Sequence, residues 1–168
     1  MKRDDVMGCE IAGLGVHIKV ADIEKSRKFY ESLGFKPIFA YGDEKWRGTF
    51  SKSVGTAPEK YRGVTFQISE NAQLEVAEGH IAIKDNGIFQ EIIKSPKISA
   101  MIRVKSIAPL FKNPNINIKF PIRHYYWGTI EAAFRDPDGF VLVFIAPYSK
   151  EEFDAVKKYS PIEEINAK

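Results

Sequence analysis

Imidazole, thiol and carboxylate groups are the side chains of this 168-residue chain that could bind a metal ion or exchange a proton. The histidines are His17, His80 and His124, and the single cysteine is Cys9. In the run LGVHIKV, His17 alternates with apolar residues, so a strand would turn it away from the apolar face. Glu75 alternates in the same way within QLEVA. Taken singly, each residue fits a ligand-binding role or a solvated strand position.

Other catalytic chemistry has no motif in this sequence. The chain contains no GxSxG nucleophile elbow, no Walker loop, no GxGxxG and no HExxH. The Gly13-Leu14-Gly15 pair leads into a strand pattern rather than a helix, so it is not a phosphate loop. A single cysteine excludes an internal disulfide and a cysteine-rich metal site, and it is typical of a reducing compartment.

Composition narrows the class of protein further. Apolar residues make up 44% of the chain and charged residues 28%, as in ordinary globular proteins. The formal net charge is only +3, and Lys and Arg are spread along the chain, which argues against nucleic-acid binding. The N-terminal residues lack the apolar run of a signal peptide, and no window reaches the ~20 apolar residues of a membrane span. We expect a cytoplasmic protein with no nucleic-acid or membrane partner.

The elements that must position His17 and Glu75 form a first β-α-β-β-β module at about residues 12–78. Asp22 is placed to cap its helix, and Gly34 to end it. The strand patterns are Leu14–Val20, Lys36–Tyr41, Val64–Ser69 and Gln73–Ala77, with the helix over 23–33. The segment Gly42–Lys60 is predicted to be a polar, turn-rich connection.

A second β-α-β-β-β module is predicted at about residues 98–147, after a linker at about 79–97. Its strands are Ser99–Lys105, Asn115–Pro121 and the two arms of a hairpin over Gly128–Ala146, with a short helical stretch from Ser106. Asp, Pro and Gly at Arg135–Gly139 are turn residues, and the following run is apolar on both faces. Ser149 and Glu152 form a capping box that begins a terminal helix at about 150–160. This weak internal repeat predicts an α+β fold.

Two passages carry a resemblance to a known family. GVHIKVADIEKSRKFYESLGFKPIFAYGD (Gly15–Asp43) and WGTIEAAFRDPDGFVLVF (Trp127–Phe144) are similar to the opening strand and helix and the closing hairpin of the vicinal oxygen chelate superfamily. That superfamily groups glyoxalase I, extradiol dioxygenases and bleomycin-resistance proteins. The resemblance implies one domain of two βαβββ modules, whose strands curl into a cup-shaped mixed sheet that binds ligand on its concave side, often as a homodimer.

The resemblance also implies four positions for metal ligands, two in each module. Enzymes of this superfamily hold one divalent metal with His and Glu side chains from the first and last strands of each module. His17 and Glu75 match the two positions of the first module. Met101 and Val143 stand at the two positions of the second. A valine cannot bind a hard cation and a thioether suits only soft metals, so we expect no metal and no other cofactor.

The resulting hypothesis is a metal-independent, small-molecule-binding protein with an aromatic pocket, like the bleomycin-resistance-type members. The residues expected to bind the ligand are His17, Glu75, Met101, Arg103, Tyr126, Trp127 and Val143. Further stacking surfaces could come from Tyr41, Trp46, Phe66 and Tyr125, with Arg103 or Lys19 meeting an anionic group.

Two alternatives remain open at this stage. One is a metal-dependent lyase, isomerase or dioxygenase that uses His17 and Glu75 with help from His80 or His124. Here His80 would come from GHIAI, which resembles the strand that starts the second module of glyoxalase I. The other alternative is a structural or interaction module whose cup binds nothing.

Overall fold

The computed structural model describes residues 13–79, 99–118 and 121–166. Its contacts divide this part of the chain into two compact units. Unit 1 holds the chain up to Lys19 and from Phe35 to Gly79, and unit 2 holds Val20–Gly34 and the described chain from residue 99 on. The helix α1 (Ile23–Ser32) therefore follows the first strand of unit 1 in sequence but belongs to unit 2. No helix within the described ranges is long and apolar enough to cross a membrane.

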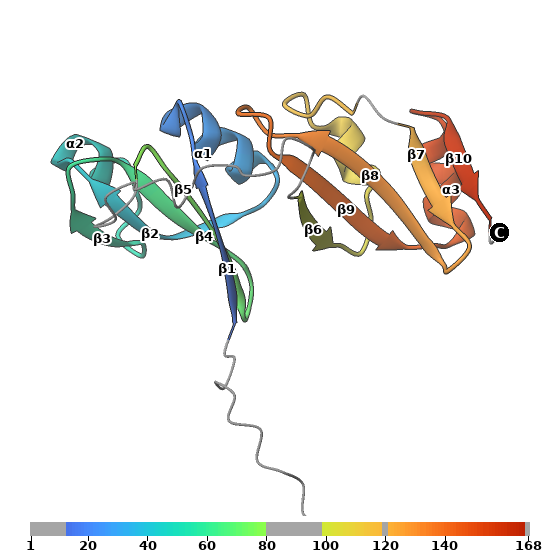
Figure 1. The fold of residues 1–168 in the computed structure, drawn as a ribbon, viewed down its shortest axis with the longest axis horizontal. Helices are drawn as coiled ribbons and strands as arrows, with labels where there is room; N and C mark the ends of the chain where they lie inside the picture. Colours follow the sequence, from blue (N-terminus) through green and yellow to red (C-terminus); the bar gives the residue numbers. More distant parts are fainter. Residues whose placement is uncertain (1–12, 80–98, 119–120, 167–168) are drawn as a thin grey trace, which may run out of the picture. The chain divides into compact units, whose positions relative to one another are not determined.

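Unit 1 is a five-stranded mixed sheet (Figure 1). Its order is β1 (Leu14–Lys19), β5 (Ala72–Ala77), β4 (Gly63–Ser69), β2 (Lys36–Gly42) and β3 (Gly55–Pro58). The outer pairs β1/β5 and β2/β3 are parallel, and the inner pairs are antiparallel. The short helix α2 (Glu44–Arg47) lies between β2 and β3 in sequence.

Unit 2 has a second five-stranded sheet with the same arrangement of its repeated strands. The order is β6 (Ser99–Arg103), β9 (Val141–Pro147), β8 (Thr129–Arg135), β7 (Ile122–Tyr125) and β10 (Ile162–Ile165). As in unit 1, the first and last strands of the repeat, β6 and β9, pair in parallel. The 3₁₀ helix η1 (Ala108–Lys112) and the helix α3 (Lys150–Lys157) complete the unit with α1.

The α+β fold of two βαβββ modules is thus confirmed, with one added edge strand in each sheet. Numbered within its own module, each sheet has its four repeated strands in the order 1-4-3-2. These strands are β1, β5, β4 and β2 in unit 1, and β6, β9, β8 and β7 in unit 2. The added strands are β3 and β10, and the sequence analysis predicted neither. Most of the predicted linker at about 79–97, with the GHIAI segment that contains His80, lies outside the described residues.

Two local predictions were wrong in detail. The strand expected at Asn115–Pro121 is β7 at Ile122–Tyr125, because the Asn113 side chain and carbonyl oxygen bind the backbone N–H groups of Asn115 and Ile116 and turn the chain there. The connection Gly42–Lys60 contains α2 and β3. The Asp43 carboxylate caps α2, since it accepts a hydrogen bond from the Trp46 backbone N–H at 2.8 Å.

The turn between β8 and β9 holds α1 through two carboxylates. The buried Asp136 accepts hydrogen bonds from the Tyr30 hydroxyl at 2.8 Å and from the backbone N–H groups of Asp138 and Phe140 at 2.9 and 2.8 Å. Asp138 accepts from the backbone N–H of Ala21 at 2.9 Å and from the Ser26 hydroxyl at 3.2 Å. The helix is therefore joined to the hairpin at its N-terminus and in its middle.

Removing the Tyr30 hydroxyl tests how much this junction stabilises unit 2. We expect Tyr30→Phe to lower the free energy of unfolding by about 1.5–3 kcal/mol, because a buried hydrogen bond to a carboxylate is lost. Tyr126→Phe is the control, since Tyr126 is 61% exposed and should change stability by less than about 0.5 kcal/mol. Chemical denaturation measures both, and equal effects of the two variants would contradict the prediction.

Candidate functional site

Each sheet has one apolar face and one face rich in polar groups. In unit 1 the apolar face carries Val64, Phe66, Leu74 and Val76, each no more than 2% exposed. We call the opposite face the His17 face; strand register places on it His17, Lys19, Tyr41, Thr65, Gln67, Gln73 and Glu75. We call the corresponding face of unit 2 the Met101 face; it carries Met101, Arg103, Arg123, Tyr125, Thr129, Glu131, Ala133, Val143 and Ile145.

The structure brings His17 and Glu75 together. They are direct partners in the parallel pair β1/β5, so an imidazole and a carboxylate lie side by side on the His17 face. His17 is exposed and Glu75 is half-buried. The Tyr41 hydroxyl donates to Oε1 of Glu75 at 2.5 Å. One carboxylate oxygen is therefore already engaged by a protein hydrogen bond.

Tyr41 can reach Glu75 because its ring lies directly over a glycine. Tyr41 and Gly63 are partners across β2 and β4, and a Cβ atom at Gly63 would come within 2.2 Å of the tyrosine ring. The ring is buried, and it packs edge-on against Tyr61 with 5.9 Å between centroids. Burial, and then the hydrogen bond to Glu75, raise the pKa of Tyr41 well above its usual range. Tyr41 is thus a fixed, neutral hydrogen-bond donor at physiological pH.

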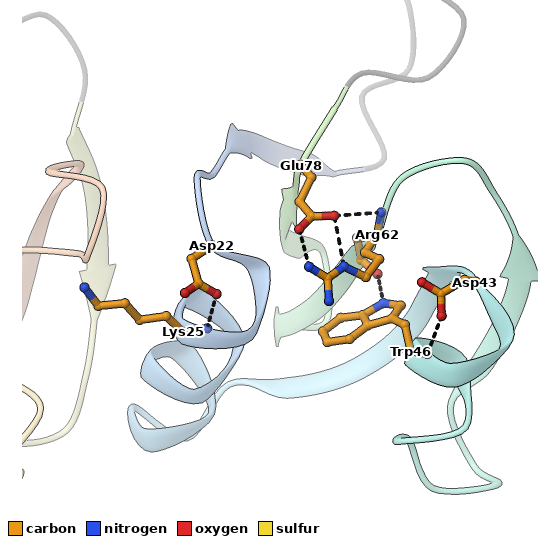
Figure 2. Close-up of polar contacts among 7 residues, drawn as sticks. Asp22, Lys25, Asp43, Trp46, Arg62 and Glu78 are labelled. Atoms are coloured by element: carbon orange, nitrogen blue, oxygen red, sulfur yellow. Dashed lines mark hydrogen bonds and ion pairs between the residues drawn. The ribbon is translucent and has the colours of Figure 1, made fainter.

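Trp46 and Arg62 fix the backbone on which Tyr41 rests (Figure 2). The Trp46 indole N–H donates to the Gly63 carbonyl oxygen at 3.2 Å, and the Arg62 guanidinium lies 5.6 Å from the centre of the indole ring. Arg62 also forms a two-point ion pair with Glu78, at 3.0 and 2.5 Å. Figure 2 shows these contacts converging on the start of β4. They hold Gly63 in place, and Gly63 in turn leaves room for Tyr41.

Tyr61 is one of several residues of this cluster that no sequence pattern indicated. Its hydroxyl oxygen is buried and has no hydrogen-bond partner among the described residues. Its ring contacts the Tyr41 ring, and a Cβ atom at Gly79 would come within 3.0 Å of it. No local motif marks Tyr61, because its position depends on the pairing of β4 with β2.

Met101 and Val143 occupy in unit 2 the place that His17 and Glu75 occupy in unit 1. They are direct partners in the parallel pair β6/β9, as His17 and Glu75 are in β1/β5. The second pair therefore lies at the same point of the repeat but carries a thioether and an isopropyl group. Neither group binds the Zn, Ni, Fe or Mn ions that imidazole and carboxylate favour. Within the described residues, the implied four-ligand metal site is not present.

The remaining histidines do not restore such a site in the part of the chain that the structure describes. His80 lies outside the described residues. His124 alternates away from the Met101 face; its ring stacks on Tyr148 at 3.9 Å and its Nδ1 lies 2.6 Å from a carboxylate oxygen of Glu164. Among the described residues, no group of three or more His, Cys, Asp or Glu side chains is arranged to bind a metal.

The other predicted ligand-binding residues lie in unit 2. Arg103 is on the Met101 face, one row from Met101 and opposite Ile145. Trp127 lies in the turn between β7 and β8 and stacks on Tyr125, with 4.2 Å between ring centroids. Its indole N–H donates to the Thr129 hydroxyl at 2.8 Å. Tyr126 meets Trp127 edge-on in the same turn. The structure thus groups the predicted residues into two sets, one on each sheet.

Solved structures with this fold were found by comparison of the coordinates. A glyoxalase family protein from Bacillus anthracis is 17% identical over 88% of this chain and 100% of its own, with a TM-score of 0.50. A glyoxalase/bleomycin resistance protein/dioxygenase superfamily member from Sphaerobacter thermophilus is 22% identical, with 84% and 99% coverage and a TM-score of 0.50. Lactoylglutathione lyase from Agrobacterium tumefaciens is 12% identical, with 82% and 95% coverage and a TM-score of 0.51.

These likenesses establish the fold that the two sequence passages imply, that of the solved glyoxalase and glyoxalase/bleomycin resistance/dioxygenase proteins. No protein-family model matches the sequence, and neither does any curated protein. At identities of 12–22% the likeness concerns the fold alone.

A matched pair of glycine substitutions tests the support of Tyr41. We expect Gly63→Ala to destabilise the protein by about 2 kcal/mol or more, because the new methyl group overlaps the Tyr41 ring. Gly15→Ala is the control on β1, where nothing lies within 4 Å of the added carbon, and it should be neutral or slightly stabilising. Thermal unfolding compares them. A Gly63→Ala protein as stable as Gly15→Ala would show that the Tyr41 ring lies elsewhere.

The raised pKa of Tyr41 predicts a loss of stability at alkaline pH. Below about pH 10 the phenol is neutral in both the folded and the unfolded chain, so its contribution is complete. Above that pH the unfolded chain releases the proton while the folded chain keeps it, and stability falls by about 1.4 kcal/mol per pH unit. Tyr41→Phe should reduce this slope by that amount in denaturation series at several pH values. An unchanged slope would contradict the assignment.

Proposed function

We propose that this protein binds a small organic molecule on the polar faces of its sheets, without a resident metal ion. The observation that carries the proposal is the equivalence of two strand pairs, His17 with Glu75 and Met101 with Val143. In the metal-dependent enzymes that share the fold, the resemblance implies metal ligands at all four positions. Here the second pair offers apolar surface instead, which suits contact with an organic ligand.

The state of Glu75 supports the same proposal. Its Oε1 accepts the Tyr41 hydrogen bond, which holds the carboxylate in place so that Oε2 can accept a hydrogen bond from a ligand. Together His17, Glu75 and the Tyr41 hydroxyl form a cluster of hydrogen-bonding groups on one face. Such convergent polar groups beside aromatic rings are typical of small-molecule sites.

The main alternative is a metal-dependent lyase, isomerase or dioxygenase. The register of His17 with Glu75 is the observation in its favour, since an imidazole and a carboxylate on neighbouring strands are suitable metal ligands. Two protein ligands would need water or substrate to complete the coordination shell, and binding would be correspondingly weak.

A homodimer and a cytoplasmic location stay predictions from the sequence.

Metal analysis of protein purified without chelators distinguishes the metal-free binding protein from the metal-dependent enzyme. We expect far less than one metal ion per chain, and the same content in wild type and His17→Ala. Stoichiometric Zn, Ni, Fe or Mn that is lost in His17→Ala would overturn the metal-free proposal. Asp154→Ala, an exposed carboxylate on α3, controls for adventitious surface binding.

A small-molecule library then tests binding itself. A ligand present at 100 times its dissociation constant stabilises the folded state by about 2.7 kcal/mol and raises the melting temperature measurably. We expect at least one compound to do so in the presence of EDTA. If no compound in a chemically broad library shifts the melting temperature, the protein is better explained as an interaction module.

A further inference from the structure

Trp127 forms a rigid aromatic platform at the edge of the Met101 face. One face of its ring stacks on Tyr125, with an angle of only 12° between the two planes. Its indole N–H is held by Thr129, whose hydroxyl donates in turn to Oε1 of Glu131 at 2.8 Å. The ring is nevertheless 56% exposed, which is unusual for a tryptophan whose orientation is fixed by a hydrogen bond. A ring that is both fixed and exposed loses little side-chain entropy when a planar ligand stacks on it.

The middle of the Met101 face is an apolar surface. Register places Met101, Val143 and Ala133 in one row across β6, β9 and β8. Ile145, in the next row, is only 6% exposed, whereas Met101 is 67% exposed. The flexible side chain of an exposed methionine on such a surface can adapt its conformation to contact an aromatic or aliphatic group.

One row of side chains across this face carries charged groups on four of its five strands. Register gives the order Arg103, Ile145, Glu131, Arg123 and Glu163, from β6 to β10. The Arg123 guanidinium pairs with Glu163, with 3.4 Å between Nε and Oε2. Arg103 is separated from Glu131 by Ile145 and forms no ion pair with any described residue. Of the two arginines in the row, Arg103 is therefore the one whose charge is available to a ligand.

We propose that the ligand of the Met101 face is an aromatic carboxylate, with its ring on Trp127 and its carboxylate on Arg103. This inference rests on the proposed function and names the ligand class. A guanidinium matches a carboxylate in planar, two-point geometry. β8, whose Thr129 holds the Trp127 indole, and β6, which carries Arg103, are two strand spacings and one row of side chains apart, or roughly 12 Å, a gap that the long Arg103 side chain and a bicyclic ring with a carboxylate together can span. The Glu131 carboxylate, between them, would repel an anion placed elsewhere in the row.

Binding of two matched probes tests the inference. 2-Naphthoate carries the ring and the charge, and 2-naphthamide is its neutral isostere. In two-dimensional NMR titrations of the full chain, we expect wild type to bind naphthoate on the order of tenfold more tightly than naphthamide. Arg103→Gln should remove this preference and leave the affinity for naphthamide unchanged. Trp127→Leu should weaken both probes on the order of tenfold while the spectrum of the free protein keeps the dispersion of a folded chain.

Arg123→Gln is the matched control, because it removes a guanidinium from the same row whose charge is already paired. The carboxylate preference should survive in this variant. The inference is overturned if wild type shows no preference, if the preference survives in Arg103→Gln, or if Arg123→Gln removes it equally. Failure of both probes to bind overturns it as well. A non-aromatic or cationic compound that raises the melting temperature in EDTA would leave the proposed function standing and overturn only this ligand class.

Discussion

The buried carboxylate of Asp136 is the group on which the arrangement of unit 2 depends. It accepts two backbone N–H groups of its own turn and the hydroxyl of Tyr30 from α1. A turn that closed the hairpin without this carboxylate would remove the hydrogen bond of the buried Tyr30 hydroxyl to Asp136, at a cost of about 1.5–3 kcal/mol. The raised pKa of Tyr30, due to burial and then to Asp136, reflects the same environment. The turn that marks the fold in the sequence is therefore also the anchor of a distant helix.

Because the hairpin of β8 and β9 is held in place, the alternation of side chains along these strands determines which residues lie on each face of the sheet. The core side chains of β8 and β9, among them Phe134, Leu142 and Phe144, are buried on one side. The intervening residues must then face the other way, whatever their chemistry. Val143, between the buried Leu142 and Phe144, therefore lies on the Met101 face. The parallel pairing of first and last strands in both units makes the two positions comparable without reference to any other protein.

Much of the fold could be predicted from local patterns, and much of the site could not. Alternation in LGVHIKV and QLEVA correctly separates His17 and Glu75 from the apolar face, because side chains in a strand point to opposite sides. The contact of Tyr41 with Gly63 depends on strand register, which no single stretch of sequence contains, so Tyr41 was only one of several candidate aromatics. The strand β10 was missed because four residues with two central glutamates resemble a solvated segment, and pairing with β7 overrides that tendency.

The added strands β3 and β10 also discourage the pairing of their sheet edges with strands of another chain. An open strand edge invites pairing with another chain, and short, charged or proline-containing edge strands discourage it. β3 has four residues and ends at Pro58, which has no N–H to donate, and β10 has four residues with Glu163 and Glu164 at its centre. Both are poor templates for a further strand. Their presence would protect concentrated solutions of this protein from edge-to-edge aggregation at these two edges, and would leave β1 and β6, the other edge strands among the described residues, as the places where pairing with another chain could start.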